Sequence, residues 1–391
     1  MEMYCRGLAG AEIKLAQTGD LVEKNIGWVS NESPTTEGST VYVPTAVDRY
    51  TSKEENFSWF KVVSTHQVAH LEFGSFGFEF ETKSTLFDDL RPRLEEIRTE
   101  SASKKLEEQV EAALHQPEGS ELEEIGTAES EEIDTDAEET SQGLERAWLT
   151  DMQRYFDLFE DRKLALDIFT VVEDGRLDSR VKIEYPGIKS SYTKVQSDSH
   201  ENRMDIKELP AREALVEFMV RLSLQQYEGV EAPIRYVDEA RRIAVLAKRV
   251  LVPEATVEDV SEASLRIYAI IAGIPNEEIP PEDWDDMDFE DEDEDEYEDP
   301  DEMEQLLQQI GMGMEMELRP EGEEEYESIE DVDFRGDFKP ELAQLMTELR
   351  MQQQDQMTDA EGEPLTQEQL QELLENSAEL EIQEVQGEIQ E

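Results

Sequence analysis

Acidic residues gather in two long stretches of this chain, and this uneven distribution sets the strongest limit on what the chain can fold into. The longer stretch spans 276–333 and includes the block 289–296, in which every residue after Phe289 is Asp or Glu. The shorter stretch spans 116–143. Segments with few apolar side chains and much like charge cannot bury enough surface to offset the entropy lost on ordering. We therefore predict two disordered acidic linkers, with the folded part built from the rest.

The overall charge excludes some classes of partner. The chain has 391 residues, with 35 Lys and Arg against 99 Asp and Glu, which gives a formal net charge of −64. A protein that binds nucleic acid needs a basic surface to neutralise phosphates, and no basic cluster here is free of interspersed carboxylates. The same charge disfavours anionic membrane surfaces. We therefore expect no nucleic acid among the partners.

The chain also lacks the features of a membrane or secreted protein. No apolar run approaches the roughly 18 residues needed to span a bilayer, and the N-terminal residues lack the charged-then-apolar pattern of a signal peptide. Cys5 is the single cysteine, so no internal disulfide can form. These features predict a cytoplasmic protein without membrane insertion.

Apolar periodicity predicts a mainly α-helical fold with a short strand near 40–44. A break is expected near Pro92 in the second helix, and at Asp161 or Gly175 in the third. The expected helical segments are 53–73, 86–114, 144–180, 210–226, 237–250 and 257–271.

Neither side of the shorter linker has enough apolar residues for a core of its own, so we expect 37–114 and 144–275 to form one helical domain. The region 336–391 is expected to be a short helical segment that leads into a C-terminal domain missing from this chain.

Two histidines form the clearest chemical pattern. His66 and His70 lie four residues apart in the helix expected at 53–73, so their imidazoles share one helical face at a separation that a zinc ion can bridge. In the related H-E-x-x-H motif of metalloproteases a glutamate follows the first histidine, but here that position holds Gln67. A carboxamide cannot accept a proton from water, so even a metal-loaded site would be a poor hydrolase. The alternative is a pair of buried histidines that make ordinary hydrogen bonds.

Glu173 is the predicted third ligand for such a zinc ion. It directly follows an apolar helical face, and a carboxylate there is costly to bury unless it is paired or coordinated. The alternative is a salt bridge from Glu173 to Arg176 or Arg180. With Glu173 as the ligand, Arg176 is expected to neutralise Asp174 or Asp178.

Four segments resemble the N-terminal region of NorD/CbbO-type proteins. They are Val41-Tyr42-Val43-Pro44, the helix from Asn56 to His70 with the Glu72-Phe73-Gly74-Ser75-Phe76 tail, the segment 169–176, and Asp333-Phe334-Arg335-Gly336-Asp337-Phe338-Lys339-Pro340. The resemblance covers roughly 37–114 and 144–275. In that family a helical region precedes a von Willebrand factor A domain, and the protein works with a MoxR-class AAA+ ATPase that activates or remodels enzymes.

This chain departs from the family pattern in one respect. The Asp-x-Ser-x-Ser signature of the A domain is absent, because Asp178-Ser179-Arg180 and Asp198-Ser199-His200 both break it. The chain also has no G-x-x-x-x-G-K-[ST] loop, so it is not the ATPase itself. We expect either a fragment of a longer protein or an A domain that is lost or supplied in trans, and we favour the fragment.

The resemblance implies a non-enzymatic adaptor that works with a MoxR-class AAA+ ATPase and a target enzyme. Two alternatives stay open. One is a metal-dependent hydrolase that uses His66, His70 and Glu173, against which Gln67 argues. The other is an acidic scaffold or chaperone-like protein whose charged arms keep partners soluble.

Overall fold

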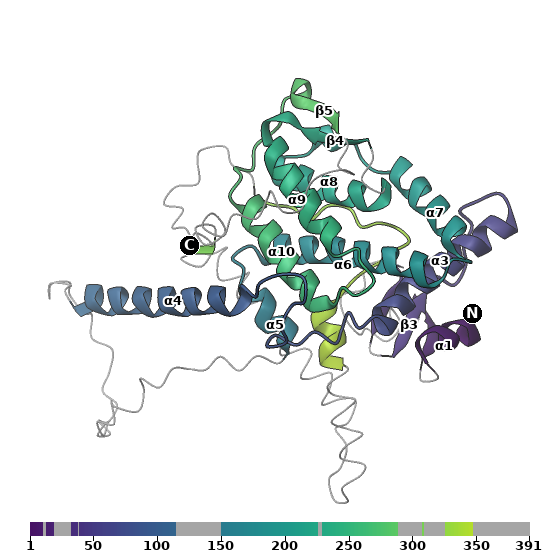
Figure 1. Cartoon of the computed structure of the whole chain (residues 1–391), viewed down its shortest axis with the longest axis horizontal. Helices are drawn as coiled ribbons and strands as arrows, with labels where there is room; N and C mark the ends of the chain where they lie inside the picture. The colour runs from purple at the N-terminus through teal and green to yellow at the C-terminus, as the bar shows by residue number, and fades with distance from the viewer. Residues whose placement is uncertain are drawn as a thin grey trace, which may run out of the picture.

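A computed structural model describes residues 1–10, 13–18, 33–37, 39–114, 150–225, 229–287, 307–308 and 325–346. These residues form a mainly α-helical fold with a few short strands, as predicted (Figure 1). The linker predicted at 116–143 lies outside them. The helices are α1 (Glu2–Ala9), α3 (Lys53–Glu72), α4 (Arg91–Leu114), α5 (Asp151–Phe156), α6 (Arg162–Glu184), α7 (Lys189–Glu201), α8 (Ala211–Gln225), α9 (Val237–Arg249) and α10 (Val257–Ala272). The strands are β1 (Lys14–Gln17), β2 (Thr35–Glu37), β3 (Thr40–Val43), β4 (Val230–Pro233) and β5 (Trp284–Met287).

Local sequence signals fix both ends of α3. The Ser52 hydroxyl accepts a hydrogen bond from the backbone N–H of Glu55, which satisfies a free donor of the first turn. At the other end Gly74 adopts a φ of 75°, and the N–H of Ser75 donates to the carbonyl of His70. This is the six-to-one hydrogen bond of a Schellman motif. It folds the chain back so that Ser75 lies beside His70.

The long central helix α6 begins where one of the two predicted breaks lies. Asp161 caps it by accepting a hydrogen bond from the N–H of Leu164. Gly175, the other predicted break point, lies inside the helix. A Cβ there would make ordinary van der Waals contact with Leu251 and Ser223, each 3.8 Å away, so Gly175 is a helical residue and not a break.

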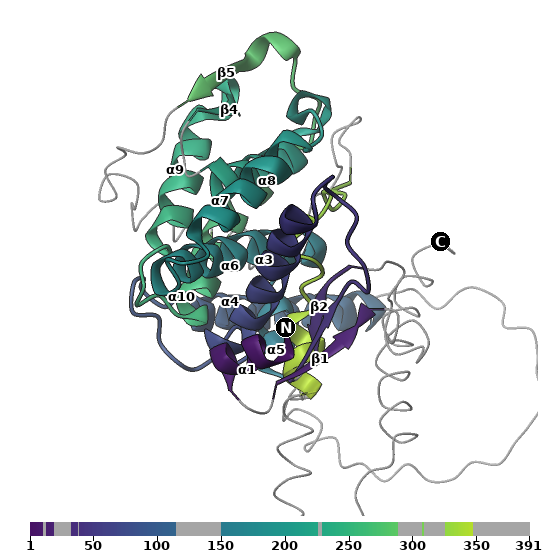
Figure 2. The ribbon, with the colours of Figure 1, turned by 90° about the vertical axis from the view of Figure 1, so that its right-hand side faces the viewer.

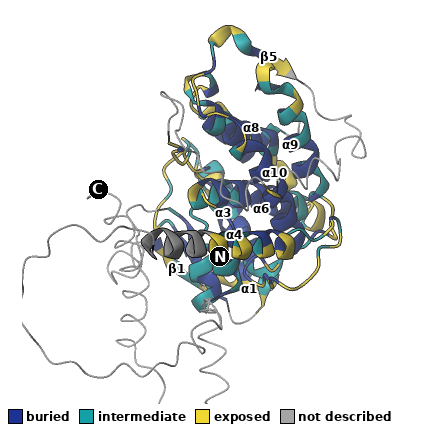
Figure 3. Cartoon of the chain, turned by 90° about the vertical axis from the view of Figure 1, so that its left-hand side faces the viewer, coloured by how far each residue is buried: buried dark blue, intermediate teal, exposed yellow. Residues whose placement is uncertain are grey.

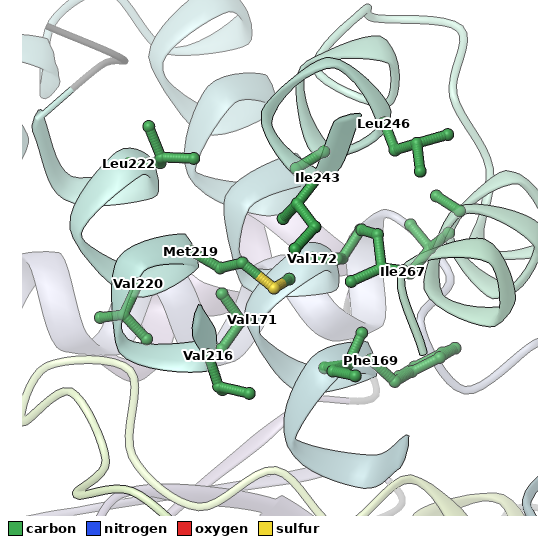
Figure 4. Close-up of a cluster of buried hydrophobic side chains, with 14 of the residues drawn as sticks. Phe169, Val171, Val172, Val216, Met219, Val220, Leu222, Ile243, Leu246 and Ile267 are labelled. Atoms are coloured by element: carbon green, nitrogen blue, oxygen red, sulfur yellow. The ribbon is translucent and has the colours of Figure 1, made fainter. Parts of the chain in front are cut away.

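The main core surrounds α6, which contacts α3, α8 and α10. Its buried residues come from both sides of the 116–143 stretch, for example Trp59 and Leu94 on one side and Phe169 on the other. Figure 3 shows α6 and α8 as largely buried helices. Figure 4 shows apolar side chains of α6, α8, α9 and α10 gathered between the helices, with Met219 among them. The two sequence segments therefore share one core.

A small sheet and α1 cover the face of α3 that points away from this core (Figure 2). The strand order is β1-β3-β2, with β1 parallel and β2 antiparallel to β3. A second apolar cluster lies under it, which includes Cys5, Val41 and Val68. Because α3 is covered on both sides, most of its second half is buried.

Both described ends of the predicted acidic linker 276–333 belong to the fold. At its start, Asn276 is buried and Trp284 begins β5, which pairs with β4. At its end, Tyr326 is buried and donates a hydrogen bond to Asp167 over 2.7 Å. Apolar and aromatic residues spaced among the carboxylates thus fix both ends of 276–333 to the core, and most of the middle lies outside the described residues. Of 336–391, residues 340–346 are helical and the part beyond 346 is outside the description.

The helix α7 was not predicted, because its sequence is mostly polar. In α7 few residues are apolar, and Tyr192 and Val195 supply most of its buried apolar surface. Among the described residues, no helix is both long and apolar enough to cross a membrane.

Residues 332–338, which we call the C-terminal strap, lie across α3 and α6 and pair with the start of β2. The N–H of Asp337 donates to the carbonyl of Pro34, and the Thr35 hydroxyl donates to the carbonyl of Asp337. Gly336 has a φ of 70°, and a Cβ at this position would lie 2.1 Å from the Pro34 carbonyl oxygen. Only glycine therefore fits this close approach.

Replacement of Gly336 by Ala should lower the free energy of unfolding by at least about 2 kcal/mol, because backbone strain and a steric clash add. Gly187→Ala is the matched control, since Gly187 has open space around it. Urea unfolding of the two variants and the wild type measures the difference. A Gly336→Ala protein as stable as Gly187→Ala would show that the strap does not dock in this way.

Candidate metal centre

Two pairs of side chains face each other where α3 meets α6. His66 and His70 lie one turn apart on α3, with ring centroids 5.1 Å apart. Asp174 and Asp178 lie one turn apart on α6. The exposed fractions are 0% for His66, 2% for His70, 5% for Asp174 and 1% for Asp178. Four ionisable side chains are therefore held together away from water.

Three atoms of this group converge. The Nε2 atom of His66 lies 3.3 Å from Oδ1 of Asp174, and the Nε2 atom of His70 lies 3.9 Å from the same oxygen. These three residues are a set whose ligand atoms all lie within 4.8 Å of one another. Among the described residues, neither His66 Nε2 nor Asp174 Oδ1 has a hydrogen-bond partner. The 3.3 Å between these two atoms is longer than the usual charge-assisted hydrogen bond.

The other nitrogen of each imidazole is held by a polar partner. Nδ1 of His66 lies 2.9 Å from Oδ1 of Asp178 and 3.0 Å from the Tyr192 hydroxyl. Nδ1 of His70 lies 3.1 Å from the hydroxyl of Ser75, which in turn donates to Glu173. Each ring is therefore oriented by its Nδ1 atom, and its Nε2 atom is turned toward Asp174.

Glu173, the predicted third ligand, lies on the opposite side of His70 from Asp174. Its carboxylate is fully buried and accepts two hydrogen bonds from Arg176, over 2.6 and 2.8 Å. The salt bridge from Glu173 to Arg176, which was the alternative to metal binding, is therefore present. Successive helical residues point about 100° apart, so two neighbouring carboxylates of α6 cannot face the same point. The carboxylate that lies with both histidines is Asp174.

Arg176 is consequently engaged with Glu173 and not with Asp174 or Asp178, contrary to expectation. The cation beside those two aspartates is Arg335 of the strap, with Nη2 2.6 Å and Nε 3.1 Å from Oδ2 of Asp178. Its Nε atom also lies 3.9 Å from Asp174. Arg335 and Asp178 are 157 residues apart, so no local sequence pattern could predict this pair.

The strap covers the two histidines. The ring of Phe338 stacks on His70 with centroids 4.7 Å apart, and the ring of Phe334 lies edge-on to His66 at 5.8 Å. Gln67 anchors the same segment, because its side-chain amide donates to the carbonyl of Arg335 and its oxygen accepts from Thr36. Gln67 thus serves as a structural anchor, although it occupies the general-base position of the metalloprotease motif.

Electrostatics distinguish the two histidines. Burial lowers the pKa of His66, but the carboxylates of Asp174 and Asp178 outweigh it and raise the pKa to about 9. Burial and the nearby charges of His66 and Arg176 hold the pKa of His70 well below its usual value. Burial alone would raise the pKa of Asp178, yet Arg335 and His66 keep it below its usual range. The cluster favours a cation between His66 and the two aspartates.

No protein-family model, curated protein or solved structure matches this chain. The chemical capacity of the cluster therefore rests on its own geometry. Two imidazole nitrogens and one carboxylate oxygen form a ligand set suited to zinc and similar divalent ions.

Replacement of Arg335 by Met should destabilise the fold by about 3–5 kcal/mol, because Asp178 would be left as a buried charge without its guanidinium partner. The exposed pair of Arg49 with Asp333 on the same strap provides the control, and Arg49→Met should cost no more than about 1 kcal/mol. Urea unfolding at pH 7 measures both.

The same pair predicts a pH dependence. The pKa of Asp178 is lower in the folded protein than the unfolded value of about 3.9, so its ion pair stabilises the fold at neutral pH and less as the pH falls below that value. The deficit of Arg335→Met should therefore shrink on acidification. Adding Asp178→Asn should recover part of the lost stability at pH 7, and strictly additive losses would contradict the pairing.

Proposed function

We propose that this chain is a non-enzymatic adaptor of the cytoplasm, whose helical domain presents a target enzyme to a MoxR-class AAA+ ATPase. The observation that carries the proposal is the burial of the one described cluster with catalytic potential. His66, His70 and Asp174 are at most 5% exposed and lie under the C-terminal strap. A hydrolase needs a metal-bound water that a substrate can reach, and such burial suits a structural role better.

The position of Gln67 argues in the same direction. Its amide is committed to Thr36 and to the strap, so it neither acts as a base nor points toward a substrate. The hydrolase alternative would need another general base near the cluster. Asp178 is already bonded to His66, Tyr192 and Arg335, which leaves it poorly suited to that role.

The identity of the partner rests on sequence rather than on geometry. The segments around His66, Glu173 and Arg335 that resemble NorD/CbbO-type proteins are the ones that build the buried cluster. The net charge of −64 would also speed association with a basic surface, since opposite potentials steer encounter.

A direct binding measurement tests this function. The full chain, mixed with the MoxR-class ATPase from the same genome, should form a complex on size-exclusion chromatography and change the rate of ATP hydrolysis. Complex formation should weaken as ionic strength rises from about 0.05 to 0.3 M, because salt screens the charge attraction. An AAA+ ATPase of another class is the control.

Failure of the chain to bind the MoxR-class ATPase at low salt, with or without ATP, would refute the adaptor role. Metal-dependent peptide hydrolysis that His66→Gln abolishes would instead establish the hydrolase alternative.

A further inference from the structure

We propose that His66, His70 and Asp174 bind one zinc ion, or a similar first-row divalent cation, and that this ion latches the C-terminal strap onto α3 and α6. This site is independent of the adaptor function. It differs from the sequence-derived set in its third ligand and in the involvement of the strap.

The separations of the ligand atoms fit a tetrahedral ion. Ligands about 2.0 Å from zinc in tetrahedral geometry lie about 3.3 Å from one another. The distance from His66 Nε2 to Asp174 Oδ1 is 3.3 Å, and that from His70 Nε2 to the same oxygen is 3.9 Å. Small side-chain rotations would bring all three atoms to coordination distance of one point.

Two buried polar atoms without hydrogen-bond partners lie at the proposed position of the ion. His66 Nε2 and Asp174 Oδ1 are buried without a hydrogen-bond partner among the described residues. Buried polar atoms are rarely left in this condition, because each loses its bonds to water. A cation between them would satisfy both atoms at once.

The surroundings resemble those of known metal centres. Histidine ligands usually bond through their second nitrogen to a carboxylate or another polar group, which fixes the ring and strengthens the ligand. His66 does so through Asp178, and His70 does so through Ser75 and then Glu173. The Schellman motif after α3 thus supplies one of these second contacts.

The formal charges also favour a cation. Three buried carboxylates, of Glu173, Asp174 and Asp178, are accompanied by the guanidinium groups of Arg176 and Arg335. The cluster therefore lacks a positive charge, which a metal ion or a proton on His66 can supply. The 3.3 Å between His66 Nε2 and Asp174 Oδ1 favours the metal, because it matches the ligand spacing of a tetrahedral ion and is long for a charge-assisted hydrogen bond.

The ligand types select among metals. Two imidazole nitrogens and a carboxylate suit Zn²⁺, Co²⁺ or Fe²⁺, whereas Ca²⁺ and Mg²⁺ prefer sites made of oxygen atoms. The acidic stretches can bind Ca²⁺ and Mg²⁺ weakly. A response to Zn²⁺ or Co²⁺ but not to Mg²⁺ therefore distinguishes binding at this site from binding to the acidic stretches.

The strap is coupled to the metal site through contacts between aromatic rings and the two imidazoles. Phe338 stacks on His70 and Phe334 touches His66, so the orientation of both imidazoles and the docking of 332–338 depend on each other. An ion that fixes the imidazoles should therefore hold the strap in place.

The test uses the full chain, stripped of metal with a chelator and then titrated with Zn²⁺ or Co²⁺. We expect one-to-one binding, the visible absorption of tetrahedral Co²⁺, and a rise in melting temperature with Zn²⁺ but not with Mg²⁺. Asp174→Asn and His70→Gln should lose all three responses. His200→Gln is the control, since His200 bonds to Gln225 and does not belong to the His66, His70 and Asp174 cluster.

Hydrogen exchange reports on the latch. In the wild type, Zn²⁺ should slow exchange at the amides of 334–338, and in Asp174→Asn it should not. Bound metal without this change would refute the latch.

Absence of one-to-one metal in the wild type would refute the site itself. So would a Zn²⁺-induced melting shift that is equal in the wild type, Asp174→Asn and His70→Gln, because the ion would then act on the acidic stretches. The wild-type titration decides the question even if a variant does not fold.

Discussion

The buried carboxylate of Asp178 is the point on which the described fold depends. It receives hydrogen bonds from Tyr192 and Gln196 of α7 and from Arg335 of the strap, and it lies against His66 of α3. A charge removed from water is tolerable only when such partners compensate it. The carboxylate therefore fixes the relative positions of segments that are far apart in sequence.

This arrangement also explains why polar residues fill the space between α3 and α6. An apolar contact would tolerate several registers of the two helices, whereas a set of directed hydrogen bonds accepts few. His66 bonds to Asp178, and Arg176 of α6 donates to the carbonyl of Phe73 at the end of α3, so both contacts hold the two helices in the observed register. The aromatic and aliphatic core around Phe169 supplies the burial, and the polar cluster supplies the specificity.

The sequence predicted helices well where apolar periodicity was strong. The helix expected at 53–73 corresponds to α3, and the cap at Thr256 starts α10. It failed for α7, whose polar surface carries little periodicity, and for the ends of the acidic stretch, where isolated residues such as Trp284 and Tyr326 decide the packing. Local patterns cannot show which isolated aromatic residue will find a partner.

Only part of the candidate site was predicted, because local patterns show which residues share a helical face but not which face meets another helix. Helical spacing placed His66 and His70 on one face, and the same four-residue spacing of Asp174 and Asp178 was available in the sequence as a matching signal. The choice of Glu173 followed from its place after an apolar face, but the rotation of α6 about its axis decides which carboxylate faces α3. That rotation depends on the whole core, as does the approach of Arg335.

The late position of the strap has a consequence for biosynthesis. Residues 332–338 leave the ribosome after α10, which ends at Ala272, so at typical elongation rates of 5–20 residues per second they follow it by on the order of several seconds. During that interval α3, α6 and α7 can assemble, but Asp178 has no guanidinium partner and the two histidines have no aromatic cover. The nascent domain thus passes through a stage in which the charged cluster around Asp178 is still open to the solvent.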